Sequence, residues 1–154
     1  VIATASPNAF ERVREAGADH VLDYRAPDLA AQIMALTDGK GIDRAVEVEF
    51  GVNIALLSEM MRANGTIAAY GSQLEMAPTL PFGPLLFKAV TIDIVLVYIL
   101  EQAPRAAAIE KLHAALTTGA LKPAIHEILP LEQAAEAHER VMTAGRNGAV
   151  LLKI

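Results

Sequence analysis

Short apolar runs alternate with amphipathic stretches from Val1 to Val97, and this alternation constrains the fold more than any other feature of the sequence. The runs are short and rich in β-branched residues, as buried strands are, whereas the stretches between them repeat their apolar residues at helical spacing. Strands that alternate with helices form parallel sheets covered by helices, through right-handed crossovers. The sequence therefore predicts an α/β fold with a doubly wound parallel sheet.

The boundaries of these elements follow from glycine, proline and asparagine positions. The expected strands cover residues 1–6, 21–23, 42–48, 66–70 and 90–98, and the helices among them residues 8–16, 27–36, 54–64 and 85–88. A C-terminal part follows, with a helix at 104–118, a strand at 125–129, a helix at 131–142 and a strand at 149–154. We expect residues 1–154 to form a single domain.

The run at residues 1–6 leads directly into Pro7 and a helical pattern, as the second strand of a nucleotide-binding α/β domain does. Such a domain has a first strand and a glycine-rich phosphate loop upstream. The chain contains no Gly-x-Gly-x-x-Gly motif, because Gly39 and Gly41 have the first spacing but Arg44 occupies the third position. We therefore expect a sheet that lacks its first strand and this loop, in a chain that is part of a longer protein.

Composition excludes several function classes. The net charge is −5 with no basic run, so nucleic acid is not an expected partner. The chain has no cysteine, and its four histidines lack metal-ligand spacing, so no metal site is predicted in it. The longest apolar stretch, residues 90–100, is interrupted by Asp93 and is too short to span a bilayer. We expect a cytoplasmic protein without a membrane partner.

Ligands of an open parallel sheet bind beyond the carboxyl ends of its strands, where helix N-termini offer free N–H groups. Candidate cofactor-binding residues are therefore those that follow the expected strands. They are Ser6, Tyr24, Asn53, Tyr70, Gly71, Ser72, Gln73, Val95, Leu96 and Val97. No catalytic residue is predicted.

Ser6 and Tyr24 bear on the choice of cofactor. An NAD site places a carboxylate after its second strand to bind the ribose 2′-hydroxyl, and that carboxylate repels a 2′-phosphate. Ser6 is small and neutral there, and Tyr24 and Arg25 offer donors to a phosphate, so the pattern favours NADP (NADPH). The alternatives are that Ser6 caps the helix after Pro7 and that Tyr24 is a half-buried packing residue.

Two further features have competing interpretations. Glu47 and Glu49 lie on one face of a strand, as acid/base pairs do, but a strand end that faces solvent is the favoured explanation. Gly71 is typical of a plain turn, and it also permits a ligand to approach the backbone closely.

Eight segments carry a resemblance to a known family, and they cover nearly the whole chain in the same order. They are VIATAS (1–6), AGADHVLDYR (16–25), GID (41–43), GTI (65–67), YGS (70–72), GALKP (119–123), LEQAAEAHE (131–139) and GAVLL (148–152). The chain resembles the cofactor-binding and C-terminal part of the medium-chain dehydrogenase/reductase superfamily, the zinc-type alcohol dehydrogenase-like proteins. Within this superfamily it is similar to the quinone oxidoreductase (zeta-crystallin) branch.

This resemblance implies a Rossmann-type domain, with residues from about 119 to 154 joining an N-terminal catalytic domain that is absent here. It implies an NADPH-dependent reductase of quinones or α,β-unsaturated carbonyl compounds. The 2′-phosphate would lie near Ser6 and Tyr24, and backbone groups at residues 95–97 would meet the nicotinamide amide. Many relatives have a lysine where this chain has Pro7-Asn8-Ala9, which leaves the phosphate site one charge fewer. Zinc-dependent relatives hold their metal mostly with the absent domain, so the lack of cysteine decides nothing about zinc in a parent protein.

Two alternatives from other classes stay open. Residues 45–51 loosely resemble the strand-and-glycine motif of S-adenosylmethionine-dependent methyltransferases, although the following Gly-x-Gly is missing. In the second alternative the chain is a non-catalytic dimerisation module. An apolar edge strand at residues 90–100 would then pair with its copy in a homodimer. We expect the 154 residues by themselves to be inactive, because the sheet lacks its central first strand.

Overall fold

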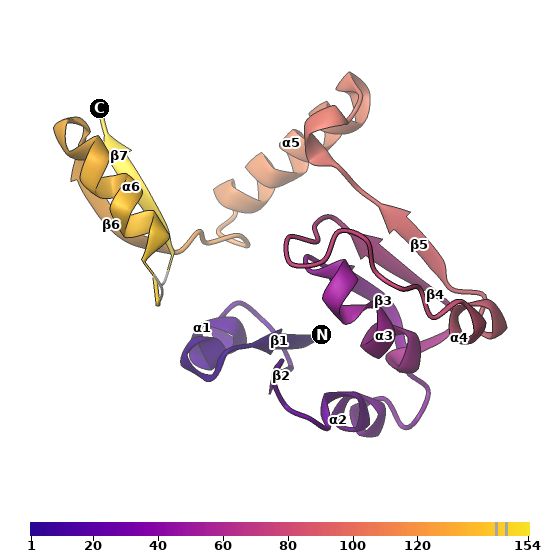
Figure 1. Cartoon of the computed structure of the whole chain (residues 1–154). Coiled ribbons are helices and arrows are strands. Elements are labelled where there is room, and N and C mark those ends of the chain that lie inside the picture. Colours follow the sequence, from indigo (N-terminus) through magenta and orange to yellow (C-terminus); the bar gives the residue numbers. More distant parts are fainter. Residues whose placement is uncertain (144, 147) are drawn as a thin grey trace. The chain divides into compact units, whose positions relative to one another are not determined.

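The computed structural model describes residues 1–143, 145–146 and 148–154, and its paired strands are all parallel (Figure 1). Strands alternate with helices along the chain, which confirms the predicted α/β fold class. The chain divides into two compact units, unit 1 (Val1–Gln102) and unit 2 (Ala103–Ile154). No described helix combines the length and apolarity needed to cross a membrane.

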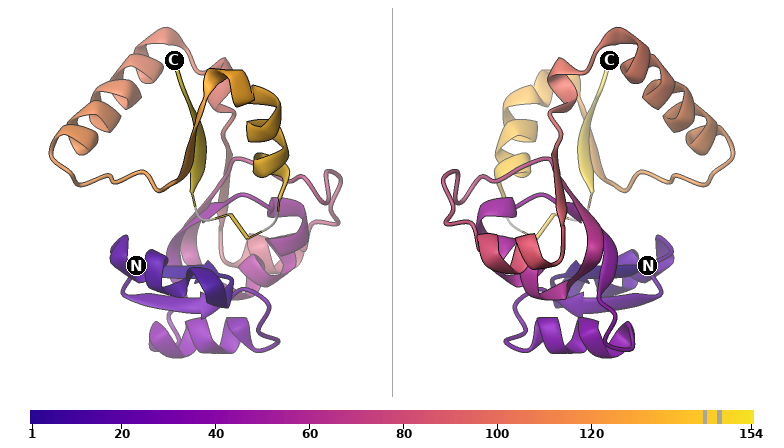
Figure 2. Two further views of the ribbon diagram at one scale, coloured as in Figure 1. Left: turned by 90° about the vertical axis from the view of Figure 1, so that its left-hand side faces the viewer. Right: turned by 90° about the vertical axis from the view of Figure 1, so that its right-hand side faces the viewer.

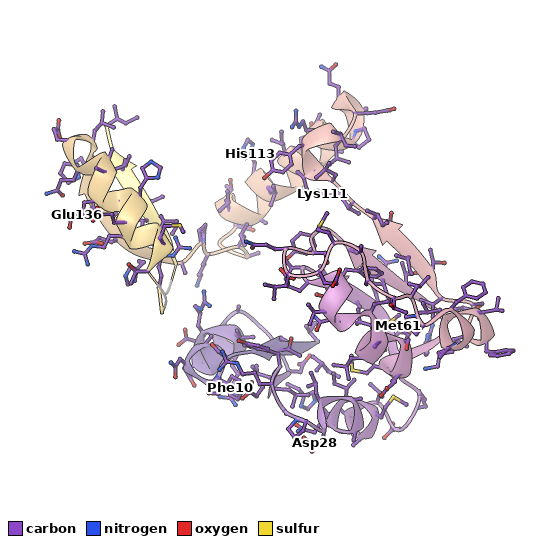
Figure 3. All side chains as sticks on the ribbon, viewed as in Figure 1. Phe10, Asp28, Met61, Lys111, His113 and Glu136 are labelled. Atoms are coloured by element: carbon purple, nitrogen blue, oxygen red, sulfur yellow. The ribbon has the colours of Figure 1, made fainter. Side chains whose placement is uncertain are left out.

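The first two strands of unit 1 form a parallel pair. β1 (Ile2–Ala5) runs beside β2 (His20–Asp23), with Ala5 opposite Asp23 at their carboxyl ends. A 3-10 turn (Pro7–Ala9) and α1 (Phe10–Glu15) connect the two strands. Proline suits the first turn because its φ is already near the helical value and it has no N–H to leave unbonded. The helix is half-exposed, and its Arg14 lies over the Phe10 ring (labelled in Figure 3) at 5.6 Å from the centroid.

A second, three-stranded sheet makes up the rest of unit 1. Its strands, in the order in which they pair, are β3 (Ile42–Glu47), β4 (Met61–Ala69) and β5 (Thr91–Ile94). The helices of this region are α2 (Leu29–Leu36), α3 (Phe50–Met60) and α4 (Phe82–Phe87). Asp28, labelled in Figure 3, precedes α2 and accepts a hydrogen bond from the Gln32 side chain one turn later, at 2.8 Å.

The core of unit 1 lies between this sheet and its helices. Ile54 of α3 and Met61 and Ile67 of β4 are its most deeply buried side chains, and Met61 is labelled in Figure 3. Six more buried residues complete the cluster: Leu29, Ile33, Ala45, Leu57, Met60 and Leu85. None of them is aromatic, as the low aromatic content indicates, and burying each Leu, Ile or Met side chain of the cluster stabilises the fold by about 1.5–3 kcal/mol.

The strands of unit 1 form two sheets, because β1 and β3 are not hydrogen-bonded to each other. The orders β2-β1 and β3-β4-β5 are the 3-2 and 4-5-6 portions of a doubly wound 3-2-1-4-5-6 sheet. The break lies where the first strand of such a sheet would be. Ile2 and Leu22 of the smaller sheet pack against the core of the larger one, so side-chain packing joins the two across the break.

Two predicted strands differ from the structure by more than two residues. The strand expected at 90–98 covers only Thr91–Ile94, because the neighbouring strand ends at Ala69, whose carbonyl oxygen accepts the last bond from Val95 N–H at 2.8 Å. The chain then makes a 3-10 turn at Val97–Ile99. The strand expected at 66–70 instead begins at Met61, with an irregular register opposite β3 and a left-handed backbone at Asn64 (φ 59°).

Unit 2 contains α5 (Gln102–Thr117) from its second residue onward and a small α/β layer, as the views in Figure 2 show. In this layer β6 (Ile125–Pro130) pairs in parallel with β7 (Ala149–Lys153), and α6 (Ala134–Met142) connects them. These elements confirm the helices and strands predicted for the C-terminal part. On α6, Arg140 donates a hydrogen bond to Glu136 (labelled in Figure 3) at 3.0 Å. This bond, together with the charge of Glu127, raises the pKa of Arg140 above its usual value.

Candidate cofactor site

A cavity of about 990 Å³ in unit 1 lies along the break between the two sheets. One side is formed by β1 residues Ile2, Ala3 and Thr4, and the other by the whole of β3. Apolar side chains of α2 and α3 line it, and polar groups lie where the cavity meets the strand ends: Tyr24, Glu47, Glu49 and Asn53. Thr37, Asp43 and Arg44 line the cavity further from these ends. The part in which Tyr24, Glu47, Glu49 and Asn53 converge is where an open parallel sheet is expected to bind a ligand.

Two predicted cofactor-binding residues, Tyr24 and Asn53, line this cavity. The other eight lie outside its described lining: Ser6, Tyr70, Gly71, Ser72, Gln73, Val95, Leu96 and Val97. The structure nevertheless places all ten at the carboxyl ends of strands or at the start of the following helix, as their sequence positions indicated. A binding role for each of them stays a prediction.

Ser6 occupies the N-cap position of the turn after β1, with an extended backbone (φ −72°, ψ 150°). Its side chain makes no capping hydrogen bond; the turn is closed by the backbone, through Ala9 N–H and the Ser6 carbonyl oxygen at 2.8 Å. Ser6 is therefore the N-cap residue before Pro7, as the alternative interpretation has it, but its hydroxyl makes no capping hydrogen bond. Ser6 is neutral, so this residue places no negative charge at the end of β1.

Tyr24 follows β2 and is 48% exposed. The guanidinium of Arg25 lies over the Tyr24 ring, 4.9 Å from the centroid. The backbone N–H of Arg25 donates to the Asp23 carboxylate at 2.9 Å. Stacking of this kind is favourable and leaves the N–H groups of the guanidinium directed to solvent or to a ligand. The pair therefore places a phenol and a cation together at the end of β2.

Asn53 lies in the first turn of α3 and is held by Glu47 at the end of β3. The Asn53 amide donates to Glu47 Oε1 at 3.0 Å, and the same oxygen accepts the Glu49 N–H at 2.6 Å. Glu47 therefore satisfies an N–H that precedes the helix and also fixes the amide that faces the cavity. This differs from the prediction of a solvent-facing carboxylate, because Glu47 and Glu49 are only partly exposed and both accept hydrogen bonds.

The loop after β4 (residues 70–75) is tied to the β3–α3 turn. Phe50 N–H donates to the Gly71 carbonyl oxygen at 3.1 Å, and Gly51 N–H donates to Ser72 Oγ at 2.8 Å. The Ser72 hydroxyl donates in turn to the Glu75 carbonyl oxygen. The hydrogen-bonding capacity of the Ser72 hydroxyl is thus largely used within the protein.

Two glycines permit this close approach. A Cβ on Gly51 would overlap the Glu75 carbonyl oxygen, and a Cβ on Gly71 would lie 2.6 Å from the Val48 carbonyl oxygen. Gly71 was predicted to admit a ligand close to the backbone. In the structure the group that approaches it is the β3–α3 turn of the same chain.

The described residues contain no group of three or more His, Asp or Glu side chains arranged to hold a metal ion. Zinc would therefore need ligands from beyond this set. The groups at the strand ends are of a kind that a nicotinamide dinucleotide uses, because Tyr24 and Asn53 bring a hydroxyl and an amide to the cavity and the Arg25 guanidinium stacks on Tyr24.

These features define a nucleotide-binding type of α/β unit, and comparison with known proteins gives its family. Residues 16–152 match the zinc-binding dehydrogenase family, and the chain belongs to that family. The predicted relationship to the medium-chain dehydrogenase/reductase superfamily, in its quinone oxidoreductase branch, is confirmed.

Individual relatives agree with this assignment. The chain is 29% identical over 158 residues to a probable quinone oxidoreductase of Schizosaccharomyces pombe, covering 99% of this chain and 46% of the relative. It is 27% identical over 143 residues to the quinone oxidoreductase of Sus scrofa, covering 91% and 42%. The crystal structure of an NAD-dependent alcohol dehydrogenase superposes with a TM-score of 0.84 at 29% identity, over 100% of this chain and 43% of that one. The chain thus spans about half the length of the curated relatives it matches.

Proposed function

We propose that the chain is the cofactor-binding part of an NADPH-dependent oxidoreductase that reduces a small quinone or α,β-unsaturated carbonyl compound. The bound nicotinamide would supply the hydride, and this part of the protein would orient the dinucleotide and exclude water. The observation that carries the proposal is the group of polar side chains, Tyr24 and Asn53 among them, at the carboxyl-end part of the cavity between β1 and β3, in a chain of the zinc-binding dehydrogenase family. Its curated relatives named as quinone oxidoreductases support the reaction class.

The preference for NADPH rests on the ends of β1 and β2. Ser6 brings no carboxylate to repel a 2′-phosphate, and Tyr24 and Arg25 together offer a hydroxyl and a cation. Hydrogen bonds to a charged group contribute about 1.5–3 kcal/mol each, so one such bond corresponds to about a 10–100-fold preference.

The test is calorimetric titration of the chain with NADPH and with NADH. We expect NADPH to bind about tenfold more tightly, and Tyr24→Phe to reduce the affinity for NADPH but not for NADH. Tyr98→Phe is the matched control, because Tyr98 is 84% exposed and lies in the turn after β5. Equal affinities for the two dinucleotides would overturn the 2′-phosphate assignment. Binding of neither would overturn the proposal that this chain holds the cofactor.

We also propose that a further parallel strand, from the rest of the enzyme, occupies the break between β1 and β3. Among the described residues neither strand has a hydrogen-bonded neighbour on that side, and residues of both strands line the cavity between them. The added strand would fill the length of this cavity and leave its carboxyl-end part, at Tyr24 and Asn53, to the cofactor. Residues from about 119 to 154 would join the catalytic domain that selects the substrate. We therefore expect no turnover from the 154 residues alone.

A homodimer through residues 90–100 is a further part of the proposal. β5 is the outer strand of its sheet, and Ile94, Tyr98 and Ile99 are 80%, 84% and 76% exposed. An apolar edge of this kind is protected when it pairs with a second copy. Light scattering after gel filtration would show a dimer that Ile94→Lys converts to a monomer, whereas Met142→Lys in unit 2 would not. A monomeric wild-type chain at high concentration would overturn it.

The alternatives separate in the same experiments. A chain that dimerises but binds neither dinucleotide is better described as a non-catalytic dimerisation module. The S-adenosylmethionine-dependent methyltransferase alternative is disfavoured by membership of the zinc-binding dehydrogenase family.

A further inference from the structure

We infer that Glu49 is a positioning residue that holds the loop after β4 (residues 70–75) in the conformation that binds the cofactor. This inference rests on the proposed function. The carboxylate lies in the turn between β3 and α3 and reaches the loop after β4, more than twenty residues further along the chain. No catalytic role is assigned to it.

The contact uses both carboxylate oxygens. Glu49 Oε1 accepts the backbone N–H of Gln73 at 3.1 Å, and Oε2 accepts the N–H of Leu74 at 3.0 Å. Two consecutive N–H groups that point at one carboxylate define the backbone direction at that point. Because the acceptor is charged, these bonds are stronger than bonds between neutral groups.

The chemistry of the contact requires a carboxylate. A glutamine has one acceptor oxygen and an NH₂ group, so it would satisfy one of the two N–H groups and present a donor to the other. An aspartate is one methylene shorter and would not reach the loop from the same backbone position. Glu49→Gln is therefore a nearly isosteric change that removes half of the contact and introduces a donor opposite a donor.

Other hydrogen bonds hold the two ends of the loop, and the Glu49 contact lies between them. The Phe50 N–H and Gly51 N–H bonds hold residues 71 and 72, and the Ser72 hydroxyl holds the Glu75 carbonyl oxygen. Between these points, Glu49 provides the contacts to the backbone of residues 73 and 74. The β3–α3 turn, which carries Asn53, and the loop after β4 therefore form one connected unit.

These hydrogen bonds leave fewer backbone donors for a ligand at the β3–α3 turn and the loop after β4. The N–H groups of Gly51, Gln73 and Leu74 are already bonded to groups of this chain. They are not donors for the pyrophosphate, so the loop would contribute to cofactor binding through its shape and its remaining groups. Loss of Glu49 would free two N–H groups and release the loop at the same time.

The test compares Glu49→Gln with Glu59→Gln, which removes the same charge from an exposed position on α3. Amide hydrogen exchange in the absence of cofactor is measured first. We expect exchange at Gln73 and Leu74 to accelerate about tenfold in Glu49→Gln and to be unchanged in Glu59→Gln. Unchanged exchange in Glu49→Gln would overturn the inference, and far-ultraviolet circular dichroism would verify that both variants are folded.

Titration with NADPH is the second measurement. We expect Glu49→Gln to weaken NADPH binding about three- to tenfold, with Glu59→Gln equal to the wild type. Faster exchange with unchanged NADPH affinity would overturn the positioning role. If the wild-type chain binds no NADPH, the proposed function is overturned, and the positioning role with it. Faster amide hydrogen exchange in Glu49→Gln would still verify the contact between Glu49 and the loop.

Discussion

The carboxylate of Glu47 holds the side-chain amide of Asn53, at 3.0 Å from Oε1 to Nδ2, where β3 ends and α3 begins. The same oxygen accepts the Glu49 N–H, so one carboxylate fixes both the turn and the amide that lines the cavity. The hydrogen bond to Glu47 restricts the rotamers that the Asn53 side chain can adopt. Asn53 is therefore presented to the cavity in one orientation.

Replacing Asn53 with alanine should reduce the free energy of unfolding by about 1.5 kcal/mol, the lower end of the range for a hydrogen bond to a charged group, because both side chains stay partly solvated. Urea denaturation measures this directly. Val52→Ala is the control, because Val52 is 54% exposed on the same helix and its loss should change stability by no more than about 0.5 kcal/mol. Equal effects of the two variants would contradict the importance of the Glu47–Asn53 bond.

Gly51→Ala should be strongly destabilising, by about 1–3 kcal/mol, since its Cβ would overlap the Glu75 carbonyl oxygen and one of the two segments must move. Gly83→Ala, in α4, is the matched control: nothing lies within 4 Å of its Cβ, and alanine is the better helix former. We expect the control to be neutral or stabilising in thermal unfolding. A tolerated Gly51→Ala would mean that the two loops are not in contact as described.

Lys88→Met should lower stability by about 1 kcal/mol. Its ammonium group donates to the Ser58 and Glu59 carbonyl oxygens, both at 2.8 Å, at the C-terminal end of α3 where helix carbonyl groups lack partners. Methionine keeps the apolar part of the side chain and removes the donors. Lys111→Met on α5 has the same chemistry at an exposed position and should have no measurable effect on the denaturation midpoint.

Ile67→Ala should cost about 2–5 kcal/mol, because the side chain is completely buried in β4 and its removal leaves a cavity in the core. Ile94→Ala removes the same atoms from a side chain that is 80% exposed on β5. The second variant should leave the stability of the monomer unchanged, and any effect on it should depend on protein concentration. A loss of stability as large in Ile94→Ala as in Ile67→Ala would contradict the described core.

The alternation of strands and helices was predictable because it depends on residues that are close in the sequence. β-branched runs such as residues 1–6 and 42–48, with glycine or proline between them, determine element type locally, and the structure agrees within a few residues. The position of the candidate site at the strand ends follows from the same pattern. The missing cap at Ser6 and the short β5 were not predictable, since they depend on which neighbouring groups the folded chain brings near.

The role of Glu49 shows what only the tertiary structure decided. Glu47 and Glu49 in the sequence are two acidic residues at a strand end, a pattern that favours solvent exposure. In the folded chain Glu49 meets Gln73 and Leu74, and Gly51 meets Ser72, across more than twenty residues. Local composition determined the elements, whereas these pairings follow from the parallel order of β3 and β4, which brings the two loops to the same edge of the sheet.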